Sequence, residues 1–368
     1  MRIRRSMVTL LGGALALSLA VPVMAQDEPI DLNAATVGPT GEPSTAVADI
    51  APLTDEEVAQ IAEGGYKAAL LWAGAGTWYN ALSKGAQERL AELGIEVVAE
   101  SEADFDPARQ QTDVETTMAL QPDIILTLPV DPVAGGQAFR PAVEAGTKLV
   151  FVDNGIDGYV PGQDYVAIVT GDHFGMGKKA AELMADAIGG AGKIGYIFHD
   201  AEYYVTNNRD AYFKAAIEQL YPDIEIVAEQ GFADEGSTQE IAAAMIAQNP
   251  DLDGIYVAWS AAAQGVIAAL REAGKPDVKV VAYDLDATND LDMAQCGNMY
   301  GTSLDWPYLE GKVMADLAAK ALLGQEVPPF VTVEAQSMTR DNVAETWSSN
   351  VGQEVSPEIA AALEEACQ

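Results

Sequence analysis

The sequence predicts an α/β protein made of two lobes, each a doubly wound parallel sheet. Three observations indicate this fold class. Short apolar runs alternate with amphipathic segments of helical period, the runs are apolar throughout rather than at every second residue, and the series restarts once within the 368 residues. Strands of this kind are typical of parallel sheets that helices cover on both faces. About nine strand–helix alternations are too many for one sheet of ordinary size, so two lobes are expected.

The first series of elements precedes residue 153. Its predicted strands lie at 68–73, 95–100, 124–128 and 148–152, and its predicted helices at 78–93, 108–120 and 132–145. Gly94, Pro122 and Gly146 separate these helices from the strands that follow, because Gly and Pro commonly end helices.

The second series begins near residue 165 and follows the same rule. Its predicted strands lie at 165–170, 193–198, 225–228, 254–258, 279–283 and 300–304, and its predicted helices at 173–188, 208–220, 237–248, 262–273 and 308–323. Gly189 and Gly190 end the first of these helices. This second series predicts the second lobe.

The N-terminus has the three parts of a secretory signal peptide. Arg2, Arg4 and Arg5 precede an apolar run at 7–20, and small residues follow up to Ala25. This pattern predicts cleavage near Ala25 and export to the periplasm. An uncleaved membrane anchor is the alternative, but the run is shorter than the roughly 20 residues that span a bilayer.

The segment at 26–65 is predicted to be an acidic leader that contains one short helix. Residues 26–52 are rich in Pro, Thr, Ala and acidic residues and show no apolar periodicity, which predicts disorder. Thr54 and Glu57 have the spacing of a capping box at the start of a helix. That helix is expected to end at Gly64, and the globular body to begin at Tyr66.

Charge and composition exclude several classes of protein. The chain has 20 Lys and Arg against 56 Asp and Glu, a net charge of -36. Such a surface repels phosphate backbones, which excludes nucleic acid as a partner. With His173 and His199 as the two histidines, and Cys296 and Cys367 as the two cysteines, a His/Cys metal centre is not expected. Export permits a disulfide between the two cysteines, and two free thiols are the alternative.

No cofactor motif is convincing. Gly175 and Gly177 fit the pattern G-x-G-x-x-A, but they lie inside a predicted helix, which favours close helix packing over nucleotide binding. The acidic stretch at 284–290 resembles a calcium loop but lacks its glycine, so the N-terminus of a helix is the better interpretation. Neither a P-loop nor a nucleophile elbow is present. We therefore expect no cofactor and no metal.

Polar and aromatic side chains follow almost every predicted strand. In open parallel sheets, ligands bind beyond the carboxyl ends of the strands. Aromatic rings can cover the C–H faces of a polyhydroxylated ring, while carboxylates, amides and arginine bond its hydroxyls. Each residue alone could be a helix cap or part of the core, but their shared location favours a ligand site. The candidates are Trp78, Tyr79, Asp131, Asp153, Asn154, Asn208, Arg209, Trp259, Asp284 and Asp305.

With these residues in view, the chain resembles periplasmic substrate-binding proteins of the ribose-binding, type I class. The resemblance covers about residues 66–340. It depends on Gly171-Asp172 at the start of a helix, on Asn-Arg-Asp-Ala-Tyr-Phe at 208–213, and most specifically on 268–275 followed by 280–284.

The resemblance implies an architecture and a function. The N-terminal lobe would comprise 66–169 plus 306–334 and the C-terminal lobe 170–305 plus 335–368, joined by three crossover segments that act as hinges. The protein would be a monomeric receptor that captures a sugar or polyol between the lobes. It would deliver this ligand to the membrane permease of an ABC importer, so it would not be an enzyme.

Family positions carry over to individual residues. The aromatic pair after the first strand corresponds to Trp78 and Tyr79, the carboxylate after the third strand to Asp131, the sugar-binding arginine to Arg209, and a later carboxylate to Asp284.

Three positions depart from the family. Trp259 stands where the family has Asn, Asp305 stands where it has Gln, and Asp234 and Glu235 lie where a second Arg is expected. These departures imply a site that is more acidic and more aromatic than a ribose site.

Other functions remain open on the sequence. Acidic and aromatic residues could surround a cationic or amino-substituted ligand, and paired carboxylates could serve a secreted glycosidase. The signal peptide and the lack of an N-terminal helix-turn-helix exclude a transcription regulator of the same fold. The sequence does not separate transport from chemosensing.

Overall fold

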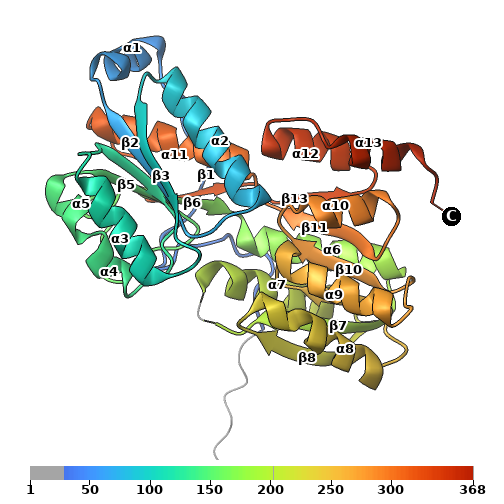
Figure 1. Cartoon of the computed structure of the whole chain (residues 1–368). Helices are drawn as coiled ribbons and strands as arrows, with labels where there is room; N and C mark the ends of the chain where they lie inside the picture. Colours follow the sequence, from blue (N-terminus) through green and yellow to red (C-terminus); the bar gives the residue numbers. More distant parts are fainter. Residues whose placement is uncertain (1–28, 202, 368) are drawn as a thin grey trace, which may run out of the picture. The chain divides into compact units, whose positions relative to one another are not determined.

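The computed structural model describes residues 29–201 and 203–367 and contains two β-sheets (Figure 1). The first sheet has the strand order β1-β12-β6-β5-β4-β2-β3, and all its pairings are parallel. Its strands are β1 (Thr45–Ala46), β2 (Lys67–Trp72), β3 (Glu96–Glu102), β4 (Ile124–Thr127), β5 (Lys148–Val152), β6 (Ala167–Gly171) and β12 (Phe330–Val333).

The second sheet has the order β13-β11-β10-β9-β7-β8. All its pairings are parallel except that of β13 with β11. Its strands are β7 (Gly192–His199), β8 (Ile224–Phe232), β9 (Gly254–Val257), β10 (Lys279–Tyr283), β11 (Met299–Leu304) and β13 (Gln336–Thr339). The predicted fold class, two doubly wound parallel sheets, is confirmed.

Helices cover both faces of the first sheet, which explains why its strands are apolar throughout. In β2, Ala68 and Leu70 pack with α2 and α11, whereas Ala69 and Leu71 pack on the opposite face with α3, α4 and α5. Successive side chains of a strand point to opposite faces, so two covered faces require a continuous apolar run. The helices are α2 (Thr77–Glu92), α3 (Pro107–Met118), α4 (Gly135–Ala138), α5 (Arg140–Ala145) and α11 (Pro307–Leu322).

The second sheet is covered in the same way. In β10, Val281 packs with the core on the α6 and α7 face, and Val280 and Ala282 pack with the core that α8, α9 and α10 supply. The helices are α6 (His173–Ile188), α7 (Tyr204–Leu220), α8 (Thr238–Gln248), α9 (Ser260–Glu272) and α10 (Ala287–Ala294), with α12 (Val343–Val351) and α13 (Pro357–Glu364) near the C-terminus.

Two predicted helices differ from the observed ones. The helix predicted at 132–145 is split into α4 and α5 around Phe139, because Pro141 lacks the N–H that a continuous helix needs and restricts the residue before it. The helix predicted to start at 208 begins at Tyr204, so Arg209 lies in its second turn rather than at its start.

The prediction of a disordered leader is wrong for residues 31–50. β1 pairs with β12, and the buried Thr36 donates to Asp172 Oδ1 at 2.6 Å and accepts from the Phe174 N–H at 3.1 Å. Lys178 Nζ also donates to the Leu32 carbonyl at 2.8 Å. The segment lacks periodicity because it forms no core of its own but completes cores that other elements build. The capping box at Thr54 is present at the start of α1 (Asp55–Glu63), as predicted.

Thr36→Val is expected to lower the free energy of unfolding by about 1–2 kcal/mol, because it removes a buried hydroxyl that makes two hydrogen bonds. The matched control is Thr40→Val, at an exposed position of the same segment, with an expected change below about 0.5 kcal/mol. Urea unfolding measures both. Equal effects of the two substitutions would mean that the leader is not packed in solution.

Near the C-terminus, Cys296 and Cys367 form a disulfide with a Cα–Cα distance of 5.6 Å across 71 residues of sequence. The bond ties the segment after α13 to the turn after α10. Arg340 adds hydrogen bonds to the Ala362 and Leu363 carbonyls at 3.2 and 3.3 Å. Within the described residues no helix is long and apolar enough to cross a membrane. The predicted signal peptide lies outside the described residues.

Candidate functional site

In each sheet, one strand marks a switch point of the topology. β2 lies between β3 and β4, and β7 lies between β8 and β9. The connection from β2 to β3 therefore runs across the sheet in one direction and that from β3 to β4 in the other, and the same holds for β7, β8 and β9. Crevices that bind ligands form at such switch points, beyond the carboxyl ends of the strands. Trp78 and Tyr79 follow β2, Asp131 follows β4, Arg209 lies in the helix after β7, and Trp259 follows β9. With Asn208, which lies beside Arg209 in the same helix, six of the predicted site residues therefore lie in the segments that follow the strands at the two switch points.

Asp153 and Asp284 occupy corresponding positions in the two sheets. Asp153 follows β5 directly and Asp284 follows β10, and both have left-handed backbones, with φ of 61° and 68°. Their N–H groups donate to the Val169 and Ser303 carbonyls of the next strand at 3.0 and 3.2 Å. A positive φ is uncommon outside glycine, although Asp tolerates it better than most residues. Such conformations cluster at functional sites. Here they hold one carboxyl group at the carboxyl end of a strand in each sheet.

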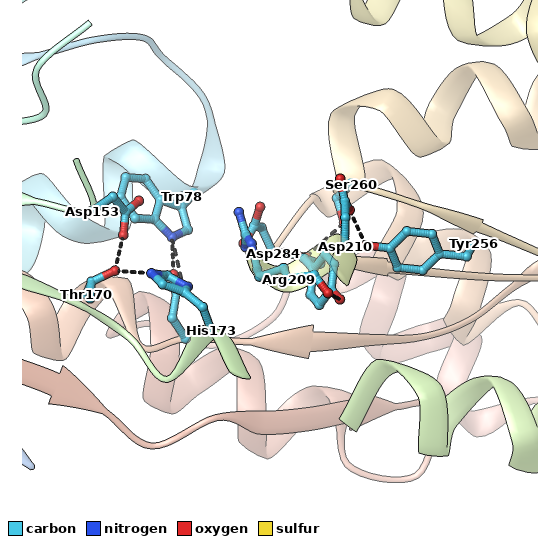
Figure 2. A network of polar contacts seen from close by, with 11 residues as sticks. Trp78, Asp153, Thr170, His173, Arg209, Asp210, Tyr256, Ser260 and Asp284 are labelled. Atoms are coloured by element: carbon cyan, nitrogen blue, oxygen red, sulfur yellow. Dashed lines mark hydrogen bonds and ion pairs between the residues drawn. The ribbon is translucent and has the colours of Figure 1, made fainter. Parts of the chain in front are cut away.

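Arg209 forms a buried ion pair with Asp284 (Figure 2). Its Nη1 lies 2.7 Å from Asp284 Oδ1, and its guanidinium lies 4.8 Å from the centre of the Tyr283 ring. The side chain is nearly inaccessible, with the residue 5% exposed. Burial alone would lower the pKa of Arg209, but the carboxylates of Asp284, Asp305 and Asp153 raise it, so the guanidinium stays charged.

Gly177 determines how closely α7 approaches α6, and hence where Arg209 lies. A Cβ at position 177 would lie 2.6 Å from the Tyr212 Cβ and 2.7 Å from the Arg209 carbonyl oxygen. The two helices thus meet backbone to backbone, which only glycine permits. The close-packing interpretation of Gly175 and Gly177 is confirmed at Gly177.

Trp78 joins the start of α2 to Asp305, which follows β11. The indole N–H lies 3.0 and 3.2 Å from the two carboxylate oxygens of Asp305, a residue only 2% exposed. The Tyr79 ring packs edge-on against Trp78 with centroids 5.0 Å apart. Both rings are half-buried. Two of the predicted aromatic residues and one predicted carboxylate therefore form a single contact group.

A second polar chain links Asp153 to a buried histidine (Figure 2). Thr170 Oγ1 donates to Asp153 Oδ1 at 2.7 Å and lies 2.6 Å from His173 Nε2. Since the single hydroxyl proton is directed to Asp153, Nε2 is the protonated nitrogen and donates to Thr170. Burial, and then the charge of Arg209, lower the pKa of His173 well below its usual value, so the ring is neutral.

Glu310 is a buried carboxyl group that interacts with Asp305 and Asp153 and that the sequence analysis did not single out. It lies in the first turn of α11, is fully buried, and neither carboxylate oxygen has a hydrogen-bond partner among the described residues. Burial, and then the carboxyl groups of Asp305 and Asp153, raise the pKa of Glu310 well above its usual value. A signal was available, because the spacing of Glu310, Met314 and Leu317 puts all three on one helix face.

Two further carboxyl groups of the site have raised pKa values. Burial, and then the charges of Asp284 and Asp153, raise the pKa of Asp305 well above its usual value. Burial raises the pKa of Asp153 to about 6, against the opposing effects of Thr170 and Arg209.

Trp259 belongs to a neighbouring aromatic group. Its indole N–H donates to Glu235 Oε2 at 2.9 Å, and its ring packs on His199 and Phe232 with centroid distances of 4.9 and 4.7 Å. Tyr203, which the sequence analysis also missed, packs on His199 at 5.3 Å and donates to the Val130 carbonyl beside Asp131 at 2.7 Å.

The other predicted site residues are engaged locally. Asp131 Oδ1 accepts from the Val133 and Ala134 N–H groups at 2.9 and 2.6 Å, as a capping residue does. Asn208 Nδ2 donates to the Tyr204 carbonyl of its own helix at 2.7 Å. Asn154 is buried beside Asp153. A role in ligand binding stays a prediction for these three, as it does for the other candidates.

The chain is similar in sequence to known binding proteins. A family model described as "Periplasmic binding protein domain" matches residues 68–326. A xylitol-binding protein of Mycolicibacterium smegmatis is 26% identical over 68% of this chain and 70% of its own length. A ribose import binding protein of Salmonella typhimurium is 24% identical over 68% of this chain and 82% of its own length.

Solved structures agree on the fold. An ABC transporter solute-binding protein of Mycobacterium smegmatis with bound glycerol is 27% identical, with a TM-score of 0.68. The similarity covers 79% of this chain and 99% of that protein.

Proposed function

The chain belongs to the periplasmic binding protein family, and from that premise we propose that it is an exported receptor which captures a monosaccharide or polyol and delivers it to an ABC importer. The family consists of substrate-binding receptors rather than enzymes.

The observation that carries the proposal is the pair Asp153 and Asp284, held in left-handed conformations at corresponding strand ends, with Arg209 paired to the second of them. Carboxylate oxygens accept hydrogen bonds from sugar hydroxyls, and a guanidinium donates to them. The half-buried rings of Trp78 and Tyr79 supply apolar faces for the C–H groups of a sugar.

The remaining parts of the proposal follow from how a two-lobed receptor works. Segments near Thr170, Asp305 and Ala335 serve as hinges, and a ligand that contacts both lobes stabilises the closed form. The membrane permease then recognises this form. We propose a monomeric periplasmic protein, with the signal peptide removed near Ala25.

A thermal-shift screen against pentoses, hexoses, polyols and amino sugars tests the function. A specific ligand raises the melting temperature by mass action, so one sugar or polyol is expected to give a clear shift. No shift with any of these compounds would contradict the proposal and leave only the fold.

Trp78→Ala is expected to weaken ligand binding by about 1–3 kcal/mol, because it removes a ring that covers the ligand. Trp78→Phe retains a ring but loses the indole N–H that bonds Asp305, so it is expected to retain more of the affinity. Isothermal titration calorimetry measures both variants. If the Phe variant loses as much affinity as the Ala variant, Trp78 acts through Asp305 rather than by contact with the ligand.

A further inference from the structure

Four carboxyl groups lie near Arg209, whose single guanidinium can balance only one carboxylate. Asp153, Asp284, Asp305 and Glu310 all interact electrostatically with Arg209. Within the described residues, the ion pair of Arg209 is with Asp284, at 2.7 Å. Asp153, Asp305 and Glu310 thus lie in a buried region without an ion-paired cation of their own.

The hydrogen bonds that Asp153 and Asp305 accept come from neutral donors. Asp153 accepts from the Thr170 hydroxyl at 2.7 Å, and Asp305 accepts from the Trp78 indole at 3.0 Å. Neither oxygen of Glu310 has a hydrogen-bond partner among the described residues. A neutral donor orients a carboxylate but does not neutralise it, and an unpaired buried charge is strongly unfavourable, so without a cation these groups tend to bind protons.

From this geometry we infer that the ligand is a sugar or polyol that bears a protonated primary amine, whose ammonium group lies against Asp153 and Asp305. The inference depends on the proposed function and names the class of ligand within it. An ammonium group supplies the missing positive charge and three N–H donors. Glu310 is fully buried and interacts electrostatically with Asp305, so it influences an ammonium group through Asp305 rather than by contact.

The aromatic residues of the site suit the same ligand. Trp78 donates to Asp305, so its ring lies beside the carboxyl group that would receive the ammonium, and Tyr79 packs against Trp78 with centroids 5.0 Å apart. Aromatic faces attract cations within about 6 Å of their centre, and Trp does so most strongly. A neutral sugar would use the ring faces but would leave the three carboxyl groups without a cation.

Calorimetry with matched ligands tests the inference on the exported protein. The probes form three series: D-glucose, D-glucosamine and N-acetyl-D-glucosamine; the corresponding galactose compounds; and D-sorbitol with 1-amino-1-deoxy-D-sorbitol. In at least one series the amine is expected to bind about tenfold or more tightly than its neutral partners. The N-acetyl compounds retain a substituent at the same carbon but lose the charge.

Substitutions then locate the effect. Asp305→Asn retains an acceptor for Trp78 but removes the charge, and is expected to reduce the amine preference to less than about threefold. Glu310→Gln should reduce the preference less, because Glu310 acts through Asp305. The matched control is Asp251→Asn, an exposed residue paired with Lys193, which should leave the preference unchanged. Thermal unfolding checks that each variant is folded.

The outcomes separate this inference from the proposed function. If a neutral sugar or polyol binds and its amine does not bind more tightly, the inference is overturned and the proposed function stands. If no member of any series binds and the thermal-shift screen also gives no ligand, both are contradicted; if a pentose or another neutral compound from that screen binds while no amine does, only the inference is overturned. If Asp305→Asn retains the full amine preference, the placement of the ammonium against Asp305 is wrong.

Discussion

Arg209→Ala is expected to weaken sugar binding about 100-fold or more, because it removes a charged donor and leaves buried carboxylates without their cation. Arg209 lies in α7 after β7, at the switch point of the second sheet, and its guanidinium is held between Asp284 and the Tyr283 ring. Isothermal titration calorimetry with the ligand found in the thermal-shift screen measures the loss. An unchanged dissociation constant would contradict the role of Arg209.

A matched control separates the site from the general effect of losing an ion pair. Arg271 also pairs with an aspartate, with Nη2 2.6 Å from Asp292 Oδ1, but lies at the end of α9 with a side chain that is 60% exposed. Arg271→Ala should leave the affinity unchanged. Arg209→Lys retains the charge but loses the planar array of N–H donors of the guanidinium, so an affinity between those of the wild type and Arg209→Ala is expected. If the lysine variant binds as the wild type does, the site requires only the charge.

Much of the fold could be predicted because its signals are local. The strand at 148–152 and the helix at 173–188 were expected with the bounds that the structure has, since both combine an apolar pattern with Gly signals at their ends. β12 and β13 have four residues each and were not predicted. The order of the leader was missed for a related reason. Composition indicates whether a segment can form a core by itself, but not whether it packs against cores that other elements form.

The site could be predicted as a location but not as a set of contacts. The rule on strand ends identified Trp78 and Asp305, yet they are separated by 227 residues, and no periodicity shows that one donates to the other. Glu310 was missed because an acidic residue in the first turn of a helix is ordinarily exposed and stabilises the helix dipole. The sharing of Thr170 between Asp153 and His173 likewise depends on two segments that meet only in the folded chain.

Gly177→Ala is expected to destabilise the protein by about 1–3 kcal/mol, although the same change in a helix ordinarily stabilises by about 0.5–1 kcal/mol. The reason is the contact between α6 and α7, where the new Cβ would lie 2.7 Å from the Arg209 carbonyl oxygen and 2.6 Å from the Tyr212 Cβ. The helices must separate to admit it, and Arg209 must move with α7. Urea unfolding is therefore expected to report lower stability, and calorimetry a lower affinity.

Gly136→Ala is the matched control, because it is the same substitution in a helix, with its nearest neighbour 3.8 Å from the new Cβ. It should leave both stability and affinity close to those of the wild type or raise stability slightly. A Gly177→Ala variant that behaves like this control would mean that α6 and α7 do not meet backbone to backbone. A loss of affinity at Gly177 larger than the loss of stability explains would indicate that the glycine acts on the ligand site through the position of Arg209. Such a result would make helix packing, rather than any residue that touches the ligand, a determinant of binding.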